Sequence, residues 1–166
     1  MSGNIVIFGP SGLVGGAALR HFDALTDWNV TALSRRPPAF EHSARFIPLD
    51  LMDRAACEKA LGELTDTTHI IYTALYEEED VIRGWRAKAQ MEINSTMLKN
   101  ALQPIDAAAK NLAHISLFQG TKAYGAHLQP PPVPARERWA RNDHENFYWY
   151  QEDFVKAQQS RREPGK

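Results

Sequence analysis

The residues with the clearest chemistry are three glycines near the start of the chain, Gly9, Gly12 and Gly15. An apolar run at 4–8 precedes them, and good helix formers at 17–19 follow. This order predicts a buried strand, a tight turn and the first turn of a helix. Backbone N–H groups and the positive end of a helix dipole converge at such a junction, so it can bind phosphate. In a dinucleotide-binding fold, Gly9 would turn the chain, Gly12 would let the backbone approach a pyrophosphate, and Gly15 would let the helix pack closely.

Related motifs do not fit this stretch. No Gly-Lys-Ser/Thr sequence follows the glycines, which excludes the phosphate loop of NTPases. Ser11 is followed by Gly12 and Leu13 without the spacing that a hydrolase nucleophile elbow needs. The remaining alternative is a plain glycine turn, but the position between a strand-like run and a helix favours dinucleotide binding.

A second candidate site is the sequence Ser34-Arg35-Arg36, which ends a predicted strand at 29–33. In dinucleotide-binding folds this position faces the adenosine ribose. An acidic residue there accepts from the 2′-hydroxyl, whereas arginine pairs with a 2′-phosphate. Two arginines and a serine therefore favour NADP(H), the alternative being a solvated basic loop.

Two further strand ends carry candidate cofactor contacts. Asp50 follows a predicted strand at 45–49 and could accept a hydrogen bond from the adenine amine. Thr73 and Ala74 follow a predicted strand at 69–72 and would pass beneath the cofactor.

Reduction of a carbonyl-bearing substrate needs a proton donor or a group that stabilises an oxyanion. Many dehydrogenases of this size use Tyr-x-x-x-Lys on one helix, but Tyr148 is followed four residues later by Glu152, so a cooperating tyrosine and lysine must come from separate elements. Lys122 lies at 119–125, directly after the last predicted strand, where ligands bind in such folds. The alternatives are an exposed loop lysine and a tyrosine that packs on the core.

The predicted elements alternate between strands and helices. Strands are expected at 4–8, 29–33, 45–49, 69–72 and 112–117, and helices at 15–24, 53–63 and about 85–102. Trp85 should lie on the apolar face of the third helix, and Pro104 should end or kink that helix. This pattern predicts an α/β fold, a Rossmann-type doubly wound parallel sheet with strand order 3-2-1-4-5 and a ligand crevice at the carboxyl ends of the strands. Residues 1–166 are interpreted as a single NAD(P)-binding domain, with a proline-rich surface loop at about 128–136 and a final helix at about 146–159.

Composition narrows the class of protein. The chain has 166 residues, 43% of them hydrophobic, and a net charge of −1, which gives no indication of a nucleic-acid or anionic membrane partner. The single cysteine, Cys57, cannot form an internal disulfide, which favours a reducing cytoplasm. The six histidines show no metal-binding spacing, and no apolar run approaches membrane-spanning length. The acidic run 77–80 is expected to be a solvated loop.

Several motifs together resemble the progesterone 5β-reductase/iridoid synthase-like (PRISE) family of atypical extended short-chain dehydrogenases. They occur in family order at 9–15, 33–37, 49–51, 71–74, 94–100, 120–125 and 146–153. The resulting set of predicted cofactor-binding residues is Gly9, Ser11, Gly12, Leu13, Val14, Gly15, Ser34, Arg35, Arg36, Asp50, Leu51, Thr73 and Ala74.

The resemblance implies an NADPH-dependent reductase of activated C=C bonds in small-molecule enones and enals. Hydride would add to the β-carbon, while Lys122 and Tyr148 stabilise the developing enolate oxygen. Members of the family are about twice as long as this chain. We therefore expect the chain to correspond to the N-terminal part, ending before a sixth strand and the substrate-binding region, with impaired activity.

Two other functions remain open at this point. One is a non-catalytic NAD(P)-binding sensor or interaction domain, for which an exposed sheet edge would favour a homodimer. The other is an epimerase or dehydratase that uses the same front half of the fold, against which the missing Tyr-x-x-x-Lys argues.

Overall fold

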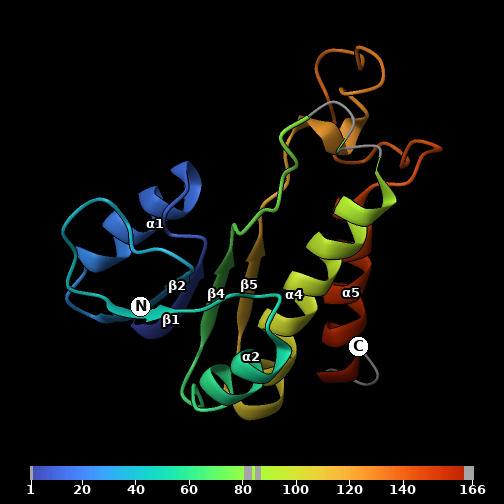
Figure 1. The fold of residues 1–166 in the computed structure, drawn as a ribbon. Coiled ribbons are helices and arrows are strands. Elements are labelled where there is room, and N and C mark those ends of the chain that lie inside the picture. The colour runs from blue at the N-terminus through green and yellow to red at the C-terminus, as the bar shows by residue number, and fades with distance from the viewer. Residues whose placement is uncertain (1, 81–83, 85–86, 163–166) are drawn as a thin grey trace. The chain divides into compact units, whose positions relative to one another are not determined.

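The computed structural model describes residues 2–80, 84 and 87–162 (Figure 1). The chain forms two compact units, which are described separately. The first comprises Met1–Leu75 and Thr96–Phe118, and the second comprises Tyr76–Ser95 and Gln119–Lys166. The interpretation of residues 1–166 as one NAD(P)-binding domain stays a prediction.

The first unit contains a five-stranded, fully parallel sheet. Its strands, in chain order, are β1 (Gly3–Phe8), β2 (Trp28–Ser34), β3 (Arg45–Pro48), β4 (His69–Tyr72) and β5 (His114–Leu117). The spatial order is β3-β2-β1-β4-β5. In the register, Ile7 of β1 lies opposite Ala32 of β2 and Ile71 of β4. The predicted Rossmann-type doubly wound sheet is confirmed.

Helices cover both faces of this sheet. Figure 1 shows α1 (Leu13–Asp23) on one side, with α2 (Arg54–Leu61) and the later turns of α4 on the other. Because side chains alternate along a strand, Ile5 and Ile7 pack toward Leu19 of α1, whereas the intervening residues face the opposite layer. Burial of both faces explains why the central strands are almost continuously apolar.

Helix α4 (Lys88–Ala108) continues through Pro104, so of the two expected effects of Pro104, ending the helix is wrong and kinking it stays a prediction. Its later turns bury an apolar face made by Leu98, Leu102 and Ile105, and this tertiary packing outweighs the local cost of one proline. Trp85, which was predicted to lie on the apolar face of this helix, falls outside the described residues.

The second unit contains the first turns of α4, the short 3₁₀ helix η1 (Thr121–Tyr124) and α5 (Phe147–Arg162). Phe147 of α5 packs with Met91 of α4 in a small apolar cluster. The side-chain amide of Gln151 donates to the backbone oxygen of Asn94 at 3.1 Å. The helix expected at about 146–159 corresponds to α5, and residues 128–136 form neither helix nor strand.

The described residues lack a membrane-spanning helix and a metal-binding cluster. No helix there is long and apolar enough to cross a bilayer. Within the same residues, His, Cys, Asp and Glu side chains do not gather into a group of three that could hold a metal ion.

Candidate functional site

The glycine turn after β1 places backbone N–H groups at the carboxyl edge of the first unit's sheet. Gly9 has φ +79°, a left-handed conformation that glycine adopts without steric cost, and its N–H donates to the Leu33 carbonyl at 3.0 Å. Gly12 begins α1 in an extended conformation, and no side chain caps the helix there. The first turn of α1 can therefore hold an anion with its N–H groups and its dipole.

Gly15 has a different function, which is close packing. A Cβ atom at this position would overlap the carbonyl oxygen of Gly9 and lie 2.5 Å from the Thr73 hydroxyl oxygen. That hydroxyl in turn donates to the Phe8 carbonyl at 2.7 Å and holds the ends of β1 and β4 together. At Gly12, by contrast, the one neighbour that an added Cβ would meet among the described residues is the Gly9 carbonyl oxygen, at 3.5 Å. The space that a side chain at position 12 would occupy is therefore not filled by neighbouring described residues.

The loop after β2 presents the two predicted phosphate-binding cations. Arg35 and Arg36 are both exposed. The Ser34 hydroxyl donates to the Arg36 carbonyl at 2.6 Å, which folds the loop back at the strand end. The Ser34 carbonyl accepts from the N–H of Leu49 at 3.1 Å, so the loop starts from a fixed point of the sheet.

The segment after β3 contains Asp50 and Leu51. The exposed Asp50 carboxylate accepts from the backbone N–H of Met52 at 2.9 Å. The Leu51 side chain is buried, and its carbonyl accepts from the buried Asn100 amide at 2.8 Å. Sequence analysis did not identify Asn100, whose contact spans 49 residues of chain. It fixes the backbone of the segment from which Asp50 projects.

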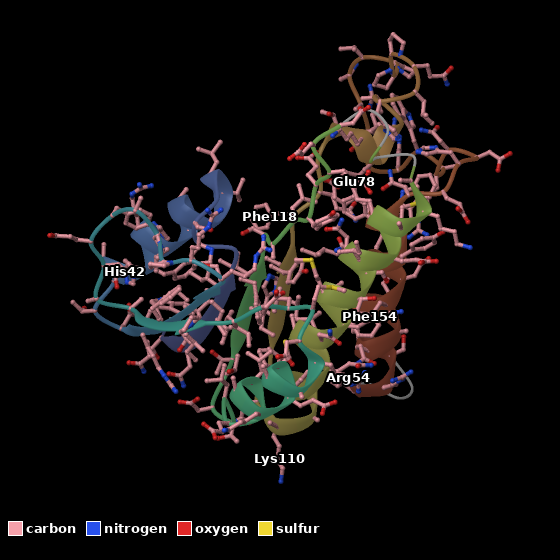
Figure 2. All side chains as sticks on the ribbon, viewed as in Figure 1. His42, Arg54, Glu78, Lys110, Phe118 and Phe154 are labelled. Atoms are coloured by element: carbon pink, nitrogen blue, oxygen red, sulfur yellow. The ribbon has the colours of Figure 1, made fainter. Side chains whose placement is uncertain are left out.

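Exposed apolar side chains surround the same edge. Leu13, Met52, Leu75 and Phe118 follow β1, β3, β4 and β5 respectively, and all are large and exposed; Figure 2 labels Phe118. Apolar side chains beside a phosphate-binding turn can contact the flat rings of a dinucleotide. These side chains and the half-buried Ala74 lie in the loops that follow the carboxyl ends of the strands.

The second unit holds the two predicted catalytic residues. Lys122 lies in η1, and Tyr148 lies in the first turn of α5. The phenol reaches the start of η1, since a Cβ atom on Gly120 would lie 3.4 Å from its oxygen. The pKa of Tyr148 is raised, and the main cause is burial of the phenol. A hydrogen bond from the Gly120 N–H lowers the pKa, whereas the negative charge of Glu77 raises it further. The phenol therefore keeps its proton at neutral pH and can donate it.

One buried side chain connects these two residues. Asn146 directly precedes α5, and its Oδ1 accepts from the Tyr148 N–H at 3.0 Å, as an N-cap residue does. Its Nδ2 donates to the Lys122 carbonyl at 2.9 Å. Sequence analysis included Asn146 in the motif at 146–153 but assigned it no contact. The second hydrogen bond joins Asn146 to Lys122, which are 24 residues apart in the chain, so no local sequence pattern indicates it.

Glu77 was also missed as a member of the site. Its Oε1 lies 3.2 Å from Nζ of Lys122, so this member of the acidic run 77–80 forms an ion pair instead of being only solvated. The signal that could have found it is its place in the chain, three residues after Ala74 at the end of β4.

A cavity of about 590 Å³ opens elsewhere in the first unit. It lies at the amino-terminal ends of β1 and β2, and Asn4, Asn29 and Asp66 are among its polar lining residues. None of the predicted site residues lines it. We place the candidate site at the carboxyl edge, where the glycine turn, the arginines and the exposed apolar side chains lie.

Comparison with known proteins identifies the family. Residues 5–147 match the model of the NAD dependent epimerase/dehydratase family. The chain is 33% identical over 95% of its length to (S)-8-oxocitronellyl enol synthase ISY1 of Nepeta racemosa. It is 32% identical over 90% of its length to 3-oxo-Delta(4,5)-steroid 5-beta-reductase of Arabidopsis thaliana. It spans only 42% and 40% of the lengths of these two relatives. The predicted resemblance to the PRISE family is confirmed by these matches.

Solved structures support the fold. UDP-glucose 4-epimerase from Bifidobacterium longum, solved in complex with NAD+ and UDP, matches 93% of this chain and 48% of its own with a TM-score of 0.71 and 16% identity. The Bordetella bronchiseptica enzyme WbmH, in complex with NAD+, matches 95% of this chain and 53% of its own with a TM-score of 0.69 and 19% identity.

Proposed function

Because the chain belongs to the NAD dependent epimerase/dehydratase family, we propose that its first unit binds a nicotinamide dinucleotide at the carboxyl edge of the sheet. The observation that carries this proposal is the start of α1, where Gly12 supplies no side-chain cap and Gly9 turns the chain at positive φ. The pyrophosphate would accept hydrogen bonds from the N–H groups of that first turn. Asp50, Leu51, Thr73 and Ala74 would form the neighbouring walls.

The proposed dinucleotide is NADP(H). Arg35 and Arg36 are exposed at the end of β2, the position that faces the adenosine ribose in this fold. A 2′-phosphate accepts charge-assisted hydrogen bonds from guanidinium groups. The Ser34 side chain, which is already bonded to the Arg36 carbonyl, would hold the loop in place for that contact.

The proposed reaction is the reduction of an activated C=C bond in a small enone or enal. When bound, NADPH supplies the hydride that adds to the β-carbon. Lys122, a cation, and Tyr148, a neutral phenol whose pKa is raised chiefly by burial, would stabilise the negative charge that develops on the substrate oxygen. The relatives named as a steroid 5-beta-reductase and an enol synthase support this substrate class for the present chain.

The test separates binding from chemistry. NADPH and NADH affinities are measured first, and NADPH consumption is then followed with a panel of enones and enals. We expect enone-dependent consumption that falls at least about 100-fold in Tyr148→Phe. NADPH binding without consumption for any substrate would instead support the non-catalytic alternative. Size-exclusion chromatography and cell fractionation would test the predicted homodimer and the predicted cytoplasmic location.

A further inference from the structure

We propose that Glu77 is a positioning residue of this site, whose carboxylate holds the Lys122 ammonium in a fixed orientation for the substrate oxygen. The inference rests on the proposed reductase function. Glu77 Oε1 lies 3.2 Å from Lys122 Nζ, and the two side chains are 36% and 27% exposed. An ion pair this exposed contributes little to folding stability. Its effect on lysine geometry is larger, because an unrestrained lysine side chain samples many rotamers that the ion pair excludes.

The backbone on both sides of Glu77 is fixed by buried amide side chains of α4. The Asn94 side chain accepts from the Tyr76 N–H at 2.9 Å and donates to the Tyr76 carbonyl at 2.8 Å. The Gln90 side chain accepts from the Glu78 N–H at 2.9 Å; Figure 2 labels Glu78. Both amides are fully buried. Glu77 therefore projects from a fixed segment, and its position does not depend on the ion pair alone.

The same carboxylate acts on the second catalytic candidate. The negative charge of Glu77 is one of the causes that raise the pKa of Tyr148, after burial. Among the described residues, the charged groups on neighbouring elements include Glu77 on the 76–80 segment, Lys122 on η1 and Glu152 one turn along α5, whose carboxylate is paired with Lys156 and Arg141. Of these, Glu77 is the group that interacts with both Lys122 and the phenol. One carboxylate thus fixes the cation and helps to keep the phenol protonated.

The backbone of Lys122 is held separately from its head group. The preceding Gly120 and the Asn146 amide fix the backbone of η1 near the phenol. Lys122 is thereby held from its backbone by Asn146 and from its head group by Glu77.

The experiment compares Glu77→Gln, Glu77→Asp and the matched control Glu79→Gln in the full chain. Glu79 is exposed two residues further along the same acidic run. The first readout is ionisation of the Tyr148 phenol, taken as the difference in alkaline absorbance titration between each protein and its Tyr148→Phe form. We expect the midpoint to fall in Glu77→Gln, because the substitution removes a negative charge that helps to raise the pKa of the phenol. It should be unchanged in Glu79→Gln and largely restored in Glu77→Asp.

The second readout is steady-state enone reduction. We expect kcat to fall about tenfold in Glu77→Gln with little change in the KM for NADPH, because the lost contact orients a catalytic group. The alkaline limb of the pH profile should move to lower pH together with the phenol midpoint. An unchanged midpoint in Glu77→Gln would overturn the inference whether or not the chain reduces enones. A shifted midpoint with unchanged kcat would overturn the positioning role, while absence of enone reduction in the parent chain would instead refute the proposed function.

Discussion

Replacing Asn146 with alanine tests whether one buried amide joins the two catalytic elements. The substitution removes the acceptor for the Tyr148 N–H and the donor to the Lys122 carbonyl. Loss of an N-cap costs about 1 kcal/mol. Loss of the second hydrogen bond costs about another 1 kcal/mol, because a carbonyl that is partly shielded from water loses its donor. We therefore expect a loss of about 2 kcal/mol in the free energy of unfolding.

The assay is urea denaturation, with thermal melting in parallel. A loss of about 2 kcal/mol corresponds to a Tm about 4–8 °C lower for a chain of this size. Asn146→Asp separates the two contacts, since it keeps the acceptor at the helix start and loses the donor to Lys122. Asn142→Ala is the matched control, because Asn142 is an exposed asparagine four residues before Asn146 in the same loop.

Two results would refute this reasoning. If Asn146→Ala costs less than about 0.5 kcal/mol, an ordinary surface value, the amide does not hold these elements. If Asn142→Ala costs as much as Asn146→Ala, the effect belongs to the loop and not to the two hydrogen bonds. In either case Lys122 and Tyr148 would need another source of alignment.

Two further predictions concern packing and pH. Gly15→Ala should destabilise the chain by about 3 kcal/mol or more in urea denaturation, because its Cβ would overlap the Gly9 carbonyl oxygen; Gly12→Ala, where space is open, should cost clearly less. Arg141 holds the pKa of Asp153 below its usual range through hydrogen bonds of 2.7 and 2.9 Å. The stabilisation of the folded state by this pair is therefore present above the pKa that Asp153 has in the unfolded state. It is lost as pH falls through the lowered pKa of the folded state. Arg141→Ala should therefore lower the unfolding midpoint at pH 7, and the difference should shrink as the pH falls below the usual pKa of an aspartate; a difference that persists undiminished in acid would contradict this account.

Much of the first unit could be predicted because its signals are local. Apolar runs interrupted by glycine or by charged residues marked all five strands, and the spacing of Gly9, Gly12 and Gly15 marked the turn. Errors occurred where tertiary contacts decide the ends of elements. The predicted strand at 45–49 stops at Pro48, and Leu49 instead donates its N–H to the Ser34 carbonyl. Helix α4 passes Pro104 because the following turn is buried.

The connections within the second unit could not be predicted from sequence. Glu77 and Lys122 are 45 residues apart, and Asn146 and Lys122 are 24 apart. No periodicity or composition relates side chains at such separations. The acidic run around Glu77 looks like an ordinary solvated loop, and only the buried amides of Gln90 and Asn94 give it a fixed position. The roles of Lys122 and Tyr148 themselves stay predictions.

The most direct test of the central claim is the affinity of the chain for NADPH and NADH, measured by fluorescence titration. Charge-assisted hydrogen bonds from Arg35 and Arg36 to a 2′-phosphate should favour NADPH by about tenfold or more. The double variant Arg35→Ala/Arg36→Ala should lose that preference and keep its NADH affinity. Arg45→Ala, which removes one positive charge at the amino-terminal start of β3, should change neither the NADPH affinity nor the NADH affinity. Equal affinity for the two cofactors in the parent chain, or binding of neither, would contradict the account.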